Sequence, residues 1–115
     1  MDNKKMEITT ETLNEVAVIA IKGKLNVTTV VDLEKAFDAL LAEPKKNVVV
    51  DCCELDYISS AGLRSLLSAA KQFKKIGGII VLAGLSNNVQ QVFEISGFTS
   101  IFPIYASKSE AVASF

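Results

Sequence analysis

The first half of the chain alternates apolar and polar stretches in a way that predicts two strands followed by a helix. Met6 to Thr12 is rich in β-favouring residues, and the short polar segment after it, residues 13–15, favours a hairpin turn. Val16 to Ile21 is continuously apolar, which is typical of a strand covered on both faces, and Gly23 is expected to end it. Apolar side chains then recur at intervals of three and four from Val30 to Leu41, which predicts a helix.

The two ends of this first helix carry their own signals. Thr29 is a candidate N-cap, and Asp32 places a negative charge in the first turn, where the helix dipole favours it. Pro44 is expected to close the segment, because proline cannot continue a helix.

The second half of the chain repeats the alternation of strand and helix. Asn47 to Cys53 is a β-branched strand segment, and Ile79 to Leu82 is a further apolar strand. Between them lies a long amphipathic helix that Gly77-Gly78 should stop. Its expected buried residues are Leu63, Leu66, Leu67, Ala70 and Phe73.

Three more elements complete the pattern. A third helix is expected from Asn87 to Ser96, with Gly97 just past its end. Ile101 to Tyr105 is the last predicted strand, and Pro103 within it favours a position at the edge of the sheet. The Ser-Lys-Ser-Glu run at residues 107–110 is a capping box that opens a C-terminal helix.

The predicted order is therefore β-β-α-β-α-β-α-β-α, which belongs to the α/β class. A hairpin followed by right-handed crossovers gives a mixed, mostly parallel β-sheet with covering helices. At 115 residues we expect a single domain over 1–115, with its core at about 6–115. This architecture hosts many functions and names none by itself.

Composition narrows the classes of function. Half of the residues are hydrophobic against 22% charged, which excludes disorder, and the net charge of −1 gives no general reason to bind nucleic acid. No apolar run is long enough for a membrane span, so a cytoplasmic protein is expected. The chain has no histidine, which removes Ser-His and Cys-His nucleophile pairs. Its only cysteines, Cys52 and Cys53, are adjacent and are expected to fill the core.

The most informative segment is the junction between the third strand and the second helix, at residues 55–64. It places Ser59 and Ser60 where the backbone N–H groups of a first helical turn have no partner within the helix. Either serine could simply cap the helix, and the same place can also hold a phosphate. Gly62 is expected to allow close packing of that turn.

Four segments together resemble a known family. They are Gly23-Lys24-Leu25-Asn26, the run Ile58-Ser59-Ser60-Ala61-Gly62-Leu63, the Gly77-Gly78 break and the helix end Ile95-Ser96-Gly97-Phe98. With the element order, they make the chain resemble a STAS domain, and more narrowly a bacterial anti-sigma factor antagonist, over roughly Met6 to Phe115. The serine run is the most specific of these segments.

The resemblance implies a binding switch rather than an enzyme. In that family the unphosphorylated antagonist binds an anti-sigma factor that is also a serine kinase, and so frees a sigma factor. Phosphorylation of one serine ends the binding, and a PP2C-type phosphatase restores it. Matching Gly62-Leu63 places the family's phosphoserine on Ser60. Ser59 and Asn26 stand where the family often has aspartate, which makes Ser59 an alternative acceptor.

The expected partner surface follows from the same resemblance and from the sheet topology, because loops that leave parallel strands gather at one end of the sheet. Arg64 lies one turn after Ser60, where it could steady a phosphate or pair with a partner carboxylate. No metal and no cofactor are expected. The surface comprises Asn26, Tyr57, Ile58, Ser59, Ser60, Ala61, Gly62, Arg64, Ser86 and Asn87.

Two other classes of function remain alternatives. The chain could be a STAS subunit of another assembly, such as a lipid-transport complex, a stressosome-like particle or a different kinase network. It could instead be a small enzyme or nucleotide-binding protein in which Asp51, Glu54 and Asp56 hold a metal ion. The absence of histidine and of a Walker-type glycine-rich loop weighs against the last reading.

Overall fold

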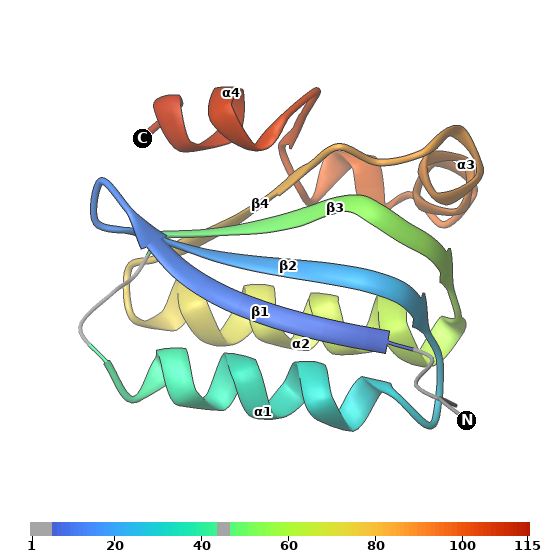
Figure 1. Ribbon diagram of the computed structural model, residues 1–115, viewed down its shortest axis with the longest axis horizontal. Helices are drawn as coiled ribbons and strands as arrows, with labels where there is room; N and C mark the ends of the chain where they lie inside the picture. Colours follow the sequence, from blue (N-terminus) through green and yellow to red (C-terminus); the bar gives the residue numbers. More distant parts are fainter. Residues whose placement is uncertain (1–5, 44–46) are drawn as a thin grey trace.

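The computed structural model describes residues 6–43 and 47–115 (Figure 1). Five strands form one sheet in the order β1-β2-β3-β4-β5. β1 pairs antiparallel with β2, and every later pair is parallel. The strands are β1 (Met6–Leu13), β2 (Val16–Leu25), β3 (Asn47–Ile58), β4 (Ile79–Ala83) and β5 (Ile104–Tyr105). The predicted mixed, mostly parallel sheet is confirmed.

Four α-helices cover this sheet from two sides. α1 (Val30–Leu41) and α2 (Ser60–Lys75) lie on one face, and α4 (Lys108–Ala113) lies on the other (Figure 1). α3 (Asn87–Ile95) sits toward the end of the sheet where β3 finishes, and a short 3-10 helix, η1 (Phe98–Ser100), follows it. The predicted order of strands and helices is confirmed, with η1 as an addition.

The hairpin between β1 and β2 has the expected tight turn. Asn14 and Glu15 form it, and both adopt positive φ angles of 52° and 67°. Such a two-residue turn matches the right-handed twist of paired strands. The turn sets the register of β1, which places Ile8 beside Ile21.

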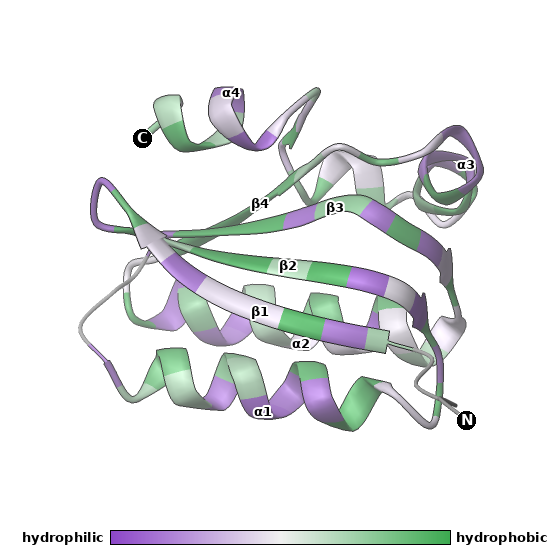
Figure 2. Ribbon diagram, viewed as in Figure 1, coloured by the Kyte–Doolittle hydropathy of each residue, from purple (hydrophilic) through white to green (hydrophobic). Residues whose placement is uncertain are grey.

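Two layers of apolar side chains bury the sheet. The larger lies between the sheet and the helices α1 and α2, and the smaller lies under α4. Figure 2 shows hydrophobic residues gathered on β2 and the first part of β3, whereas β1 at the sheet edge is mostly polar. β2 is therefore covered on both faces over its apolar run, as predicted.

The two central strands are longer than the sequence predicted. β2 continues through Gly23, which has φ 104°, and ends at Leu25. β3 continues to Ile58, five residues beyond the predicted end at Cys53. The extensions pair with each other across two register shifts, and they bury Leu55. Pairing between β2 and β3 outweighs the tendency of Gly23 to end a strand. Such pairing between distant segments is not visible in the local sequence pattern.

The last predicted strand is much shorter than expected. Only Ile104 and Tyr105 pair with β4, and Pro103 precedes the strand instead of lying within it. Phe102 turns away, because its N–H donates to the Phe98 carbonyl at 3.1 Å and its ring packs 6.1 Å from that of Phe93. The expected edge position of this strand is confirmed.

Two expectations about buried residues need correction. Cys52 is buried as predicted, but Cys53 is exposed, because successive residues of β3 face opposite sides of the sheet. On α2, Leu67 is only half-buried, as is Ala70. Ala69 takes an inward position in their place. The helix end expected at Pro44 falls outside the described residues.

Candidate functional site

Three helices begin at the end of the sheet where the parallel strands β2, β3 and β4 finish (Figure 1). This end carries the connection from β2 to α1, the junction of β3 with α2, and the connection from β4 to α3. Parallel strands with crossover connections place such segments on one side. The topology therefore gathers Asn26, the two serines and the Ser86-Asn87 pair at one end of the molecule.

The two serines of the junction have different roles. Ser59 is extended at φ −93° and ψ 174°, and its Oγ accepts a hydrogen bond from the Gly62 N–H at 3.2 Å. Its own N–H donates to the Leu25 carbonyl at 2.9 Å, which ties it to the end of β2. Ser60 is the first residue of α2 and is exposed. Ser59 is thus the cap, and the hydroxyl of Ser60 is accessible at the start of the helix.

We expect Ser59→Ala to lower the free energy of unfolding by about 0.5–2 kcal/mol, because it removes the acceptor of the Gly62 N–H. Ser60→Ala should stay within about 0.5 kcal/mol of the wild type, since that residue is exposed and is not the cap. Urea denaturation of the two variants measures the difference. A larger loss for Ser60→Ala than for Ser59→Ala would reverse the assignment.

Gly62 allows the first turn of α2 to lie directly on the ends of two strands. A Cβ at this position would lie 2.9 Å from the Leu25 Cγ and 2.9 Å from the Ile58 Cγ1. Real Cβ contacts are longer, so both neighbouring side chains would have to move. The expected close packing at Gly62 is confirmed. Ile58 is itself buried, so the predicted surface residues Ile58 and Gly62 support the surface from beneath.

Asn26 organises the turn that opens α1. Its Oδ1 accepts hydrogen bonds from the N–H groups of Thr28 and Thr29 at 2.9 and 3.0 Å, and its carbonyl accepts from Val30 at 2.9 Å. The Thr29 hydroxyl accepts from the Asn26 N–H and donates to the Lys24 carbonyl. Thr29 holds the N-cap position of α1, as predicted, but its side chain makes no capping hydrogen bond to the helix. The paired side chains of Asn26 and Thr29 were the missed signal.

Large apolar side chains stand exposed on the elements that frame this end of the sheet. Val27 in the β2–α1 connection is 74% exposed, Tyr57 near the end of β3 is 49% exposed, and Val31 at the start of α1 is 47% exposed. Tyr57 was predicted from the resemblance, whereas Val27 and Val31 were missed. A valine next to a polar turn is a weak signal, because its exposure depends on how the turn is oriented.

The remaining predicted surface residues are placed as follows. Arg64 is exposed on α2, and Ala61 is half-buried in its first turn. Ser86 caps α3, where its Oγ accepts from the Val89 N–H at 3.3 Å, and Asn87 beside it is exposed. Caps at the starts of α2 and α3 therefore both use serine.

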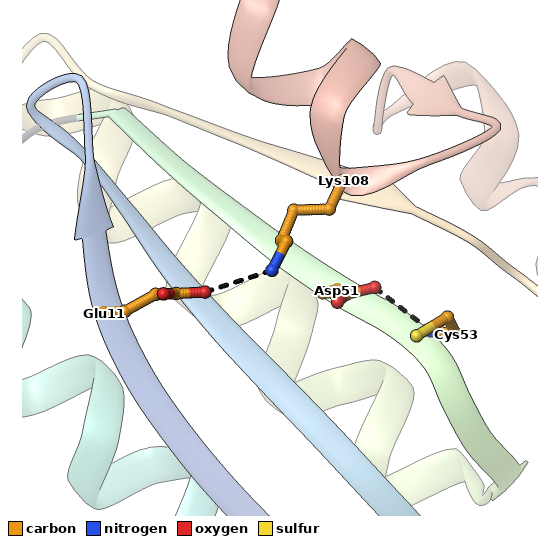
Figure 3. A network of polar contacts seen from close by, with 4 residues as sticks. All are labelled: Glu11, Asp51, Cys53 and Lys108. Atoms are coloured by element: carbon orange, nitrogen blue, oxygen red, sulfur yellow. Dashed lines mark hydrogen bonds and ion pairs between the residues drawn. The ribbon is translucent and has the colours of Figure 1, made fainter.

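Asp51, one of the acidic residues that precede the junction, lies on the face of the sheet opposite α2. Asp51 is 7% exposed on the face of the sheet that carries α4, where its Oδ1 accepts from the Cys53 N–H (Figure 3). In the same view Lys108 reaches from α4 across the sheet to Glu11, at 3.1 Å. Within residues 6–43 and 47–115, no group of three histidine, cysteine, aspartate or glutamate side chains could hold a metal ion.

The cysteines have raised thiol pKa values. Burial, then the charge of Asp51, raises the pKa of Cys52. Desolvation and the Asp51 carboxylate also raise the pKa of Cys53. Since the thiolate is the reactive form, neither residue has the environment of a catalytic or redox-active cysteine.

The whole chain can be compared with known proteins. A family model described as STAS domain matches residues 7–111. BtrV from Bordetella bronchiseptica, provisionally named an anti-sigma factor antagonist, is 40% identical over 110 residues, which cover 96% of this chain and 95% of BtrV.

Solved structures share the same fold. An anti-sigma factor antagonist from Mycobacterium paratuberculosis has a TM-score of 0.87 at 21% identity, covering 95% of this chain and 92% of that one. The antagonist SpoIIAA in its unphosphorylated form has a TM-score of 0.81 at 21% identity, covering 92% of this chain and 93% of that one. The Bacillus SpoIIAA in its phosphorylated form has a TM-score of 0.75 at 19% identity, covering 94% and 98%. In the described part of this chain, none of the helices has the length and apolar character needed to cross a membrane.

Proposed function

Because the chain belongs to the STAS domain family, we propose that it is an anti-sigma factor antagonist controlled by phosphorylation of Ser60. Unphosphorylated, it binds an anti-sigma factor that has serine kinase activity, and a sigma factor is released. A PP2C-type phosphatase regenerates the binding form. The protein acts in the cytoplasm as a substrate and a binding partner, not as an enzyme.

The observation that supports this proposal best is that Ser59 caps α2 while the neighbouring Ser60 is exposed. Ser59 closes the helix, so Ser60 can be modified without loss of the cap. A phosphate on Ser60 would lie at the positive end of the α2 dipole, where a negative charge is tolerated. The free protein would therefore keep its fold after phosphorylation.

The same phosphate would oppose binding. The proposed partner surface combines the exposed apolar residues Val27, Val31 and Tyr57 with the polar first turn of α2. A partner packed over Ser60 would have to desolvate a group with a charge of about −1.5 to −2. Burying such a charge without a paired cation is costly. Arg64 is exposed one turn away, where its guanidinium could pair with the phosphate in the unbound protein.

Incubation with the cognate kinase and ATP is expected to add one phosphate, on Ser60. The kinase is sought among neighbouring genes that encode a histidine-kinase-like ATPase, and intact mass with peptide mapping locates the phosphate. Ser60→Ala should abolish incorporation, whereas Ser59→Ala should retain it, because Ser59 acts only as the cap. Phosphate found on Ser59 would contradict the assignment. A stable kinase complex without phosphate turnover would favour a STAS subunit of another assembly.

A further inference from the structure

A groove with apolar walls lies between α2, the start of β4 and the turn after η1. Its volume is about 540 Å³, within the range of about 300–1,000 Å³ that is usual for small-molecule sites. Ile79 and Ile101 line it and are 42% and 45% exposed, although isoleucine is usually buried. Ile80 also lines it but is only 3% exposed, so the groove has accessible apolar walls and a closed floor.

One face of α2 forms a wall of this groove. Leu67, Ala70, Lys71 and Lys74 line it, and their spacing of three and four residues places them on one side of the helix. Leu67 and Ala70 are half-buried, whereas both lysines are exposed. A lysine side chain lays its apolar stem along such a surface and keeps its ammonium group in water. The wall therefore offers apolar surface within the groove and positive charge at the rim.

The charge on the rim of the groove has one sign. Lys71 and Lys74 form no ion pair with another described residue. Among residues 6–43 and 47–115, no aspartate or glutamate lines the groove, and the sequence of α2 contains none. The helix dipole favours lysine in the last turn, which accounts for Lys74 but not for Lys71, one turn earlier. The rim is therefore suited to an anionic group.

We propose that this groove binds a single-chain amphiphile with a carboxylate head, that is, an unbranched fatty acid. The alkyl chain covers Ile79 and Ile101. The carboxylate pairs with the ammonium groups of Lys71 and Lys74 at the rim. A protein partner fits less well, because a stable interface needs about 800 Å² on each side and only two of the apolar side chains that line the groove are exposed. The groove begins seven residues along α2 from Ser60, roughly 10 Å away, and is a separate site.

The test titrates the full-length ¹⁵N-labelled protein with hexanoate, octanoate and octylammonium. Octanoate should produce saturable amide shifts at Lys71, Ile79 and Ile101. Each buried CH₂ group raises the affinity about fourfold, so octanoate should bind up to about fifteenfold more tightly than hexanoate. Octylammonium has the same chain and the opposite charge, and it should bind at least about fivefold more weakly than octanoate.

Two variants with matched controls locate the site. Lys71→Glu should weaken octanoate at least about fivefold, whereas Lys35→Glu, the same change at an exposed position on α1, should leave the affinity unchanged. Ile101→Ser should weaken octanoate at least about threefold, because it removes part of an apolar wall. Ile95→Ser, at an 87% exposed position outside the groove, should not.

Equal affinities for octanoate and octylammonium, or for octanoate and hexanoate, would overturn the proposal. So would the absence of saturable shifts at the groove at millimolar octanoate, or shifts confined to the proposed partner surface around Tyr57. Self-association that Ile101→Ser abolishes would assign the apolar walls to a second copy of the chain instead. Cosedimentation with phosphatidylglycerol vesicles that Lys71→Glu abolishes would assign them to a membrane surface. Octanoate binding should persist in Ser60→Asp, so the result stands apart from the proposed switch.

Discussion

Ser60→Asp is expected to weaken binding of the kinase-type anti-sigma factor by at least about tenfold, which corresponds to about 1.4 kcal/mol. Ser60→Ala should bind like the unphosphorylated wild type. Both variants should fold, because Ser59 caps the helix and aspartate is favourable in a first turn. The reason for the difference is the charge that the partner would have to desolvate at this spot. Titration of the anti-sigma factor by calorimetry measures both affinities.

A matched control separates a local effect from a general effect of charge. Ser109 is exposed in the first turn of α4, on the opposite face of the sheet. Ser109→Asp introduces the same charge in the same type of position and should leave the affinity unchanged. Equal affinities of the alanine and aspartate variants at Ser60 would argue against a charge switch.

Leu66→Ala is expected to lower the free energy of unfolding by about 2–5 kcal/mol. Leu66 has no exposed surface, and its removal would leave a cavity between α2 and the sheet. Leu67→Ala should cost clearly less, because its side chain is half-buried and lines a groove on the surface. Urea denaturation of the pair compares one chemical change at two adjacent positions.

The stability measurement also shows whether a loss of binding results from unfolding or from a damaged interface. Leu66→Ala should reduce binding only through the loss of folded protein, together with a lower melting temperature. If this variant kept its stability and lost binding, the inner face of α2 would be an interface. Equal losses for Leu66→Ala and Leu67→Ala would place Leu67 in the core after all.

The sequence was sufficient for the order of elements because that order depends on local patterns. The apolar spacing of α1, the continuous run in β2 and the Asn14-Glu15 turn each lie within a short segment. The start of α2 at the serine pair was also predicted, because the end of an apolar strand and the start of a helical pattern meet there. These features do not depend on partners distant in the sequence.

The errors concern properties that two elements share. Residues 54–58 form strand because the end of β2 pairs with them. The sequence could not show which of Ser59 and Ser60 caps the helix and which has the exposed hydroxyl. The position of Ser59 is fixed by its hydrogen bond to the Leu25 carbonyl, which lies on another strand. The burial of Asp51 could not be predicted either, because α4, which lies over that face of the sheet, comes from the far end of the chain.

The hydrogen bond between the Ser59 N–H and the Leu25 carbonyl implies that only folded copies of the protein would take part in the proposed switch. It fixes the position of Ser60 by contact with a strand that lies far away in the sequence. A kinase that docked on this surface, as proposed, would recognise a folded arrangement that an unfolded chain with the same residues does not offer. Misfolded copies would then neither take up phosphate nor occupy the anti-sigma factor. The output would report the concentration of intact protein rather than of total protein.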